Sequence, residues 1–378
     1  MRIGIEAQRI FREKKHGMDM VALELLKNLK KIDHSNSYYI FVKPGPDKCI
    51  ASEDNFNVIE VNGGPYPTWE QIALPAAAKK YKCDILHSTS NTAPLLSRIP
   101  QIVTLHDIIY LESLNLLGGS ATSYQKFGNL YRRIIVPLAV KKSLKVVTVS
   151  EFERKRISEF MGLKQNLISI YNGVGDHFKV ITDKDILAKT QDKYKLPNKF
   201  IFFLGNTDPK KNTPNVLRAF AQFNKNSVEK YTLVMLDFEE NALQQILNSI
   251  GYPNMREQIM LIGYVPNIEL PNVINLCSAF LYPSLRESFG IPILEGMACG
   301  IPVITSNTSS MPEVAGDAAL LIDPYDYKSI SLAIEEILSN DSLRASLVKK
   351  GLERASKFSW LQMAKNYLIL YKEIYNSL

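Results

Sequence analysis

The sequence predicts an α/β protein made of two doubly wound domains with parallel sheets. Its 378 residues are too many for one ordinary core and are about right for two. Short β-branched runs alternate with stretches that have the spacing of amphipathic helices, a pattern typical of parallel sheets covered by helices on both faces. Such sheets bind ligands outside the carboxyl ends of their strands, so we expect a site in a cleft between the domains.

The order of the apolar runs predicts the domain boundaries. Seven strands are expected in the first half, at RIGIEAQ, YYIFVK, NVIEV, DILHST, QIVTLHD, KVVTVS and LISIYN, with an amphipathic helix over residues 18–31. A second series consists of KFIFFLG, a helix from about Thr213, and then YTLVML, IMLIGYV, AFLYPS, PVITS and ALLIDP. Turn signals between residues 172 and 198 indicate the interdomain linker. We therefore place the domains at residues 1–175 and 176–360.

Composition excludes several classes of protein. The hydrophobic content of 46% and the charged content of 22% are those of a globular protein. No apolar run approaches the roughly 20 residues of a membrane span, and the first residues lack a signal-peptide core, so we expect a cytoplasmic protein. The cysteines have no C-x-x-C spacing and are typical of reduced thiols; they are Cys49, Cys83, Cys277 and Cys299.

The net charge of +7 is unevenly distributed, because the positive excess lies within residues 1–180. A basic half suggests an anionic partner, such as a phospholipid surface or a phosphorylated substrate, although such residues are often only solvated. We expect reversible attachment to an anionic inner-membrane surface if the basic residues of this half share a face. The candidates are Arg132, Arg133, Lys141, Lys142, Lys145, Arg154, Lys155 and Arg156.

The strongest chemical pattern is SLRESFGIPILEGMACGIPVITS, residues 284–306. The segment from Phe289 to Pro292 reads as a loop entering a helix, whose N–H groups and dipole suit a diphosphate. Glu287 precedes this loop and Glu295 lies one turn into the helix, so one carboxylate could accept from sugar hydroxyls and the other from ribose hydroxyls. Two isolated glutamates would more often be solvated. Nearby residues favour a closely packed turn instead: Gly290, Gly296, Gly300 and Pro302.

These motifs resemble the retaining glycosyltransferases of family four, which have the GT-B fold of two Rossmann-like domains facing a central cleft. The resemblance is carried by the E-x7-E spacing, MACGIPVITSNTSSMPEVAGDAALLIDP and LGNTDPKKN, with VTLHDIIYL, TVSEFERKRI, IYNGVGDHF and FSWLQMAKNYLILY. It implies an N-terminal acceptor domain, a C-terminal nucleotide-sugar domain and a last helix, within 361–378, that packs back on the first domain. It also implies transfer of a hexosyl group to a saccharide or lipid-linked acceptor in surface polysaccharide or glycolipid synthesis. The similarity to bacterial surface-polysaccharide mannosyltransferases favours GDP-mannose over UDP-glucose or UDP-N-acetylglucosamine.

The resemblance also implies roles at the donor site. Lys211, in the pattern G-x5-K-N, would place its ammonium on the diphosphate. Glu287 would hold hydroxyls of the transferred sugar, and Glu295 would bind the ribose. Asn206 stands where many members have an arginine, so it supplies a hydrogen-bond donor without charge. The other donor-binding positions are Gly205, Val265, Phe289, Gly290 and Ile291.

On the acceptor side, the resemblance places His106 beside the donor sugar and the reaction centre. His106 and the following Asp107 close the strand VTLHD, whereas an isolated histidine would more often be a core residue. Gly17 and Asp19 belong to the loop after the first strand, where the family usually has two glycines and then an arginine. Because the carboxylate of Asp19 would repel a diphosphate, we expect this loop to bind acceptor hydroxyls. His87 is a further candidate for the cleft.

The mechanism that the resemblance implies needs no cofactor and no metal. Lys211 and the helix start at Ile291 would stabilise the departing diphosphate, one of whose oxygens takes the acceptor proton. A sugar-nucleotide epimerase or hydrolase of the same fold would use the same pocket without a separate acceptor, and a non-catalytic sugar-nucleotide-binding subunit would bind without turnover. Nucleic acid is not an expected partner, because no basic–aromatic module is visible.

Overall fold

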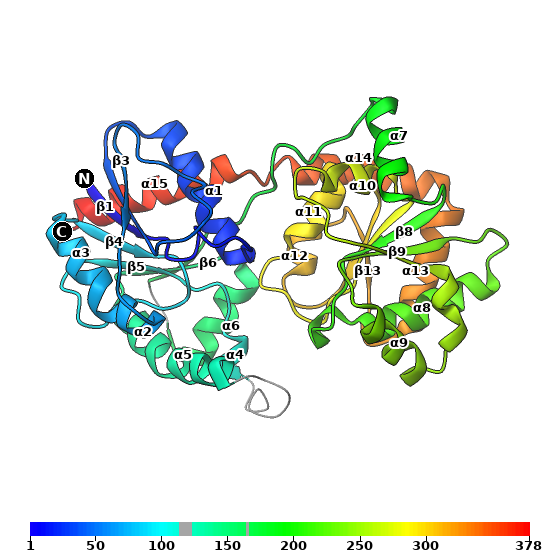
Figure 1. Cartoon of the computed structure of the whole chain (residues 1–378), viewed down its shortest axis with the longest axis horizontal. Helices are drawn as coiled ribbons and strands as arrows, with labels where there is room; N and C mark the ends of the chain where they lie inside the picture. Colours follow the sequence, from blue (N-terminus) through cyan, green and yellow to red (C-terminus); the bar gives the residue numbers. More distant parts are fainter. Residues whose placement is uncertain (113–122, 164–165) are drawn as a thin grey trace. The chain divides into compact units, whose positions relative to one another are not determined.

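The computed structural model describes residues 1–112, 123–163 and 166–378, which form two compact units (Figure 1). Unit 1 consists of Met1–Asn172 and Trp360–Leu378, and unit 2 of Gly173–Ser359. Each unit has one sheet whose strands all run parallel, with seven strands in unit 1 and six in unit 2. The prediction of two Rossmann-like α/β domains is confirmed.

The sheet of unit 1 has the strand order β3-β2-β1-β4-β5-β6-β7, so the chain winds outward in both directions from β1 and β4. In register, Ile3 of β1 lies opposite Tyr38 and Ile85 on its two neighbours. The polar ends of several predicted runs, such as His106 and Asp107, lie beyond the last residue of their strand. The strands are β1 (Arg2–Glu6), β2 (Ser37–Val42), β3 (Phe56–Glu60), β4 (Ile85–Ser88), β5 (Gln101–Thr104), β6 (Lys145–Thr148) and β7 (Leu167–Ser169).

The helices of unit 1 cover the sheet with their apolar sides. Buried leucines at positions 25, 26 and 29 of α1 face the core, as the amphipathic spacing predicts. Trp69 is fully buried and its indole N–H donates to the carbonyl of Val61 at 2.8 Å, so it serves packing. The helices are α1 (Gly17–Ile32), α2 (Tyr66–Thr68), the π-helical turn η1 (Trp69–Ala73), α3 (Leu74–Lys80), α4 (Ile109–Glu112), α5 (Ser123–Lys142), α6 (Glu151–Met161) and α15 (Trp360–Asn376).

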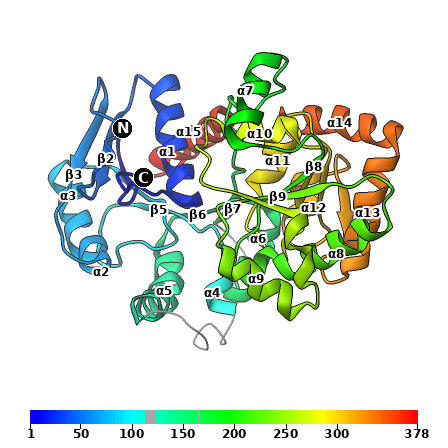
Figure 2. The ribbon, with the colours of Figure 1, turned by 45° about the vertical axis from the view of Figure 1, so that its right-hand side comes forward.

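The C-terminal helix α15 completes unit 1, where it packs beside α1 (Figures 1 and 2). Its Tyr371 hydroxyl lies 2.7 Å from Nδ1 of His87, and its Tyr367 hydroxyl lies 2.8 Å from Oγ1 of Thr104. Thr104 Oγ1 also lies 2.8 Å from Nε2 of His87, so both ring nitrogens are engaged. Burial lowers the pKa of His87 to about 3, which keeps the ring neutral. His87 is therefore a core residue that holds α15, and not the ligand contact that its sequence position suggested.

Unit 2 repeats the same winding, with the strand order β10-β9-β8-β11-β12-β13. Its central strands read as continuous apolar runs because helices cover both faces, and all four residues of β8 are buried. The strands are β8 (Phe200–Phe203), β9 (Thr232–Leu236), β10 (Ile259–Ile262), β11 (Ala279–Tyr282), β12 (Val303–Ser306) and β13 (Leu320–Ile322). The helices before β11 are α7 (Lys184–Tyr194), the 3₁₀ turn η3 (Pro209–Lys211), α8 (Thr213–Asn226), α9 (Glu240–Ser249), η4 (Pro253–Gln258) and α10 (Leu270–Leu276). Those after it are α11 (Ile291–Ala298), α12 (Met311–Ala315), α13 (Tyr327–Ser339) and α14 (Asp341–Ala355).

The expectation of a linker over residues 172–198 is wrong for the second part of that stretch, where α7 forms and packs on α10 of unit 2. The side chain of Asp183 caps this helix by accepting from the backbone N–H groups of Asp185 and Ile186 at 2.9 and 3.3 Å. A capping aspartate followed by an apolar residue three positions later indicates the start of a helix. The turn residues on either side of this stretch obscured that signal in the sequence. The only D-x-D triplet of the sequence, 183–185, thus begins a helix.

The contact between α15 and the sheet of unit 1 can be tested by removing one hydroxyl. Tyr371→Phe leaves Nδ1 of the buried His87 without its partner, so the free energy of unfolding should fall by about 1–3 kcal/mol. Tyr375→Phe is the matched control, because Tyr375 lies on the same helix and is 43% exposed. Urea unfolding of both variants measures the difference. Equal stability of Tyr371→Phe and wild type would show that the hydroxyl does not anchor the helix.

Candidate functional site

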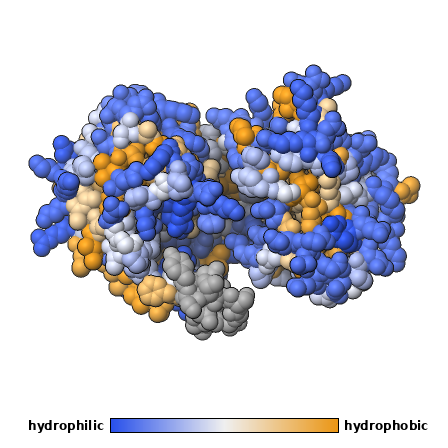
Figure 3. All heavy atoms as spheres, in the orientation of Figure 1, coloured by the Kyte–Doolittle hydropathy of each residue, from blue (hydrophilic) through white to orange (hydrophobic). Residues whose placement is uncertain are grey.

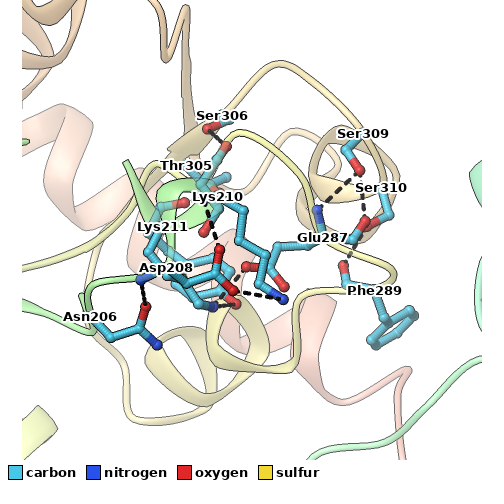
Figure 4. Close-up of polar contacts among 12 residues, drawn as sticks. Asn206, Asp208, Lys210, Lys211, Glu287, Phe289, Thr305, Ser306, Ser309 and Ser310 are labelled. Carbon is cyan, nitrogen blue, oxygen red and sulfur yellow. Dashed lines mark hydrogen bonds and ion pairs between the residues drawn. The ribbon is translucent and has the colours of Figure 1, made fainter. Parts of the chain in front are cut away.

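The predicted donor-site residues lie at one edge of the unit 2 sheet (Figure 4). Lys211 ends the turn that follows β8, Glu287 lies in the loop after β11, and Glu295 lies in α11, which follows that loop. Because every strand of this sheet is parallel, the carboxyl ends of β8 and β11 meet at the same edge. The topology therefore brings together Lys211 and Glu287, which are 76 positions apart in the sequence.

Lys211 and Glu287 form an ion pair at the centre of this edge. The ammonium of Lys211 donates to Oε1 of Glu287 at 2.7 Å and to the hydroxyl of Tyr282 at 2.9 Å. It also lies 4.6 Å from the centroid of the Tyr282 ring. The side chains of the pair are 16% and 13% exposed, so the charges are half-buried and still reachable by a ligand. Sequence reasoning did not single out Tyr282, although its place as the last residue of a buried strand is a usable signal.

Two serines in the loop after β12 hold the backbone around Glu287 (Figure 4). The hydroxyl of Ser309 donates to the carbonyl of Glu287 at 2.6 Å and accepts from its N–H at 3.2 Å. The hydroxyl of Ser310 lies 2.8 Å from the same carbonyl and 2.9 Å from that of Phe289. Ser309 has φ +60°, so its contacts with Glu287 also require a left-handed backbone conformation at this residue. Both serines belong to the family-like stretch TSNTSS, but their contacts were not foreseen.

The loop turns into α11 at Gly290, as the FGIP sequence predicts. Gly290 has φ +104°, which only glycine adopts without strain. Pro292 lies in the first turn, where its missing N–H costs nothing, and the N–H of Ile293 donates to the carbonyl of Gly290 at 3.1 Å, which leaves the N–H of Ile291 without an acceptor within the helix. Phe289 is buried against Phe358, with ring centroids 5.9 Å apart. The turn is therefore anchored in the core while the N–H of Ile291 is available to an anion.

The carboxylate of Glu295, on the first turns of α11, makes no hydrogen bond or ion pair with the residues that the structure describes. Burial raises the pKa of its carboxyl to about 7. Burial, and then the charges of Glu287 and Glu295, raise the pKa of Tyr282 well above its ordinary value. A carboxylate without a cation partner is suited to accept hydrogen bonds from hydroxyl groups.

The turn after β8 is braced by its own side chains. A Cβ at Gly205 would lie 2.2 Å from Cε1 of Phe203, so this position excludes a side chain. Oδ1 of Asn206 accepts from the N–H of Asp208 at 2.9 Å, and the Asn206 carbonyl accepts from the Thr213 hydroxyl at 2.7 Å. Asn206 therefore supports the turn in which Lys211 lies.

Asn212 joins this turn to the loops of two other strands, and sequence reasoning missed it. The residue is buried with φ +61°, and its amide donates to the carbonyls of Pro283 and Pro324 at 3.1 and 2.7 Å. An asparagine directly after the lysine of G-x5-K-N was the available signal. Val265, by contrast, is 3% exposed, so a donor contact there would have to come from its backbone.

In unit 1, His106 lies two residues beyond the end of β5 and is 5% exposed. Its Nε2 lies 3.0 Å from the carbonyl of Thr89, which can only accept, so Nε2 carries the proton. Burial lowers the pKa of the ring below its ordinary value, which favours the neutral form. Nδ1 is then a hydrogen-bond acceptor, and it has no partner among the residues that the structure describes. This arrangement suits contact with a hydroxyl group.

The other predicted acceptor-side residues have mainly local roles. The carboxylate of Asp19 is buried, lies 3.2 Å from Nε of Arg9 and accepts from the N–H of His16 at 3.0 Å. Asp19 thereby begins α1, while Gly17 is exposed and has no contact that demands a glycine. Asp107 accepts from the N–H of Ile109 at 3.2 Å, at the start of α4.

Across residues 1–112, 123–163 and 166–378, no group of three or more His, Cys, Asp or Glu side chains is arranged to hold a metal ion. In the same part of the chain, no helix has both the length and the apolar character needed to cross a bilayer.

Comparisons with known proteins agree with the division into two units. The model of Glycosyltransferase Family 4 matches residues 16–177. The model of Glycosyl transferases group 1 matches residues 187–354.

Two relatives from Escherichia coli are mannosyltransferases. O-antigen chain mannosyltransferase B is 32% identical over 242 residues, which cover 60% of this chain and 60% of that protein. The serotype-specific mannosyltransferase WbdA is 29% identical over 223 residues, which cover 58% of this chain and 27% of that protein. The chain thus matches less than two thirds of the length of either relative.

Solved structures with the GT-B fold superpose on nearly all of the chain. The sucrose-phosphate synthase from Thermosynechococcus elongatus gives a TM-score of 0.78 at 18% identity and covers 100% of both chains. Anabaena HepE, solved in complex with UDP and glucose, gives a TM-score of 0.74 at 18% identity, and the superposition covers 99% of this chain and 100% of that chain. At such identities the likeness shows the fold alone. The two family models together take in most of the sequence, and the protein belongs to the glycosyltransferases of group 1 and family four.

Proposed function

We propose that the protein is a retaining glycosyltransferase that moves a hexosyl group from a nucleotide sugar to a saccharide or lipid-linked saccharide. The observation that carries this proposal is the Lys211–Glu287 ion pair beside the first turn of α11. A fixed ammonium and the helix start at Ile291 suit a diphosphate, and a carboxylate within 2.7 Å of that ammonium suits the hydroxyls of the attached sugar. The named mannosyltransferase relatives support GDP-mannose as the donor, while HepE with UDP and glucose supports the class of ligand.

In the proposed reaction, the bond between the anomeric carbon and the diphosphate oxygen breaks while the bond to the acceptor oxygen forms on the same face. The proton of the acceptor hydroxyl passes to an oxygen of the departing diphosphate, so the reaction requires no added base. Lys211 stabilises the charge that develops on the diphosphate, and Glu287 keeps the ammonium oriented before the donor binds. The neutral ring of His106 accepts a hydrogen bond from a sugar hydroxyl near the reaction centre.

Removing the ammonium of Lys211 tests the proposed role in the leaving-group step. Lys211→Ala should lower kcat by on the order of 10²-fold or more, measured as GDP release from GDP-mannose with methyl mannosides as trial acceptors. Lys210→Ala is the matched control. Lys210 is the adjacent lysine, but its ammonium lies 3.7 Å from the carboxylate of Asp208 and does not pair with Glu287. The wild-type rate of GDP release should be the same with and without EDTA. A rate lost in EDTA and restored by Mg²⁺ would contradict the metal-free mechanism, and GDP release that needs no acceptor would favour a hydrolase or epimerase.

Glu295 tests the proposed ribose contact. Glu295→Ala should weaken the binding of GDP-mannose by about 1–3 kcal/mol in calorimetry at pH 8, because ribose hydroxyls lose their acceptor. The wild-type affinity should also fall as the pH drops below about 7, since burial makes the free carboxyl protonate there and the hydroxyls bind its ionised form. The alanine variant should lack this pH dependence. The exposed Glu335 on α13 provides the control substitution Glu335→Ala, and an unchanged affinity in Glu295→Ala would remove the ribose contact from the proposal.

The second part of the proposal is reversible binding to an anionic membrane surface through α5. Four large apolar side chains on one face of this helix, at spacings of three and four residues, are 49–57% exposed: Phe127, Leu130, Ile134 and Leu138. Apolar side chains gather in this part of unit 1 in Figure 3. Lys141 continues the stripe and is exposed, whereas Arg154 and Arg156 of the predicted basic cluster pair with Glu151 and Glu112. Apolar insertion assisted by nearby lysines is typical of helices that lie in a membrane interface.

Vesicle co-sedimentation tests this surface. Ile134→Gln/Leu138→Gln should reduce partitioning onto phosphatidylglycerol-containing vesicles by roughly tenfold or more, because two inserted side chains lose their apolar burial. Val228→Gln, at an isolated side chain that is 99% exposed in unit 2, should leave partitioning unchanged. Equal binding of the double variant and wild type, or equal binding to anionic and neutral vesicles, would speak for a soluble acceptor.

A further inference from the structure

Unit 1 contains a cavity of about 620 Å³ at the carboxyl edge of its own sheet. It is lined by the turns and loops that follow β1, β2, β3 and β4, where an open parallel sheet binds its ligands, and by the helix α5. The volume is in the range of pockets that hold small molecules. Of the predicted acceptor-side residues none lines this cavity, although Asp19 holds Arg9, which does.

The described lining of this cavity is basic and includes no carboxylate. Arg9 is balanced by Asp19, but no carboxylate among the described residues pairs with the three other cations, and Arg132 also lies 5.7 Å from the centroid of the Tyr110 ring. Lys43 donates to the carbonyl of Gly64 at 3.0 Å, and Arg132 donates to Oδ1 of Asn129 at 3.3 Å. The guanidinium of Arg12 is exposed and makes no hydrogen bond or ion pair with any residue that the structure describes. The cavity therefore carries a positive charge that nothing in its described lining neutralises.

Two tyrosines form a fixed aromatic corner of the same cavity. The rings of Tyr66 and Tyr131 meet edge to face, with centroids 5.9 Å apart at 82°. Both hydroxyls donate to the buried carboxylate of Glu70, at 2.7 and 2.5 Å. Glu70 also accepts from Thr92 and from the amide of Gln71, which fixes it in turn. The aromatic walls are thus positioned before any ligand enters, so little conformational freedom is lost on binding.

From these observations we infer that the cavity binds the acceptor and that the acceptor is an anionic saccharide, bearing a phosphate or a carboxylate. Arg12, Lys43 and Arg132 would hold the anionic group, since guanidinium and ammonium groups bind the oxygens of both anions. Tyr66 and Tyr131 would pack against the apolar face of a sugar ring. The inference rests on the proposed transferase function, for which it names the class of acceptor.

Calorimetry on the full chain without donor tests this assignment. The probes are mannose 6-phosphate, glucuronate and the neutral methyl mannoside. Wild type should bind at least one anionic probe roughly tenfold or more tightly than the neutral sugar, and Arg12→Gln should weaken that binding about tenfold. Arg98→Gln is the matched control, because Arg98 is an exposed arginine of unit 1 outside the cavity. Lys211→Ala should leave the binding of the probe unchanged, which excludes the site of unit 2.

The outcomes separate this inference from the proposed function. If only mannose 6-phosphate binds tightly, the acceptor bears a phosphate. If only glucuronate binds tightly, the acceptor contains an acidic sugar. If both bind tightly, the cavity is a general anion site. Equal affinity for methyl mannoside, no binding of either anion, or the same loss in Arg98→Gln overturns the inference. In each case the binding of GDP-mannose to Arg12→Gln is measured as well, and unchanged donor affinity shows that the donor site is intact.

Discussion

The constraint on which both units depend is that a fully parallel sheet must be covered on both faces. Its strands therefore consist of apolar residues, as in β8, and polar side chains can be placed only where the strands end. Parallel strands also end at the same edge, so the turns after them converge. Both candidate sites follow from this: Lys211 and Glu287 in unit 2, and the basic cavity with Arg12 in unit 1. The fold itself thus determines where chemistry can occur.

Within unit 2, the site depends on one residue for its charge and on several for its position. Lys211 supplies the ammonium, while Glu287 and Tyr282 orient it from two sides. Ser309 and Ser310 then hold the backbone of Glu287, so the loop after β12 controls the geometry of the loop after β11. Preorganised charges of this kind stabilise a developing anion without reorganisation during the reaction.

Unit 1 uses its buried polar groups in two different ways. His87 is satisfied on both ring nitrogens and serves to join α15 to the sheet, which makes it structural. Glu70 accepts from two tyrosines that line a cavity, so this buried network fixes the position of the cavity wall. His106 differs from both, because only one of its nitrogens is engaged. Two equally buried histidines thus differ in the number of ring nitrogens that are engaged, which leaves Nδ1 of His106 available for the contact proposed above.

The sequence by itself determined the two α/β domains, every strand that the structure describes and the donor-site candidates, because alternating apolar runs and the E-x7-E and G-x5-K-N motifs are local patterns. Only the tertiary structure decided which of these residues touch. The Lys211–Glu287 pair, the contact of Ser309 with Glu287 and the Glu70 network each join segments that follow different strands. Such pairings depend on strand order, which no local spacing records. For the same reason the cavity that Arg12 lines could not be foreseen, whereas α7 was taken as a linker because turn residues on either side obscured its capping aspartate.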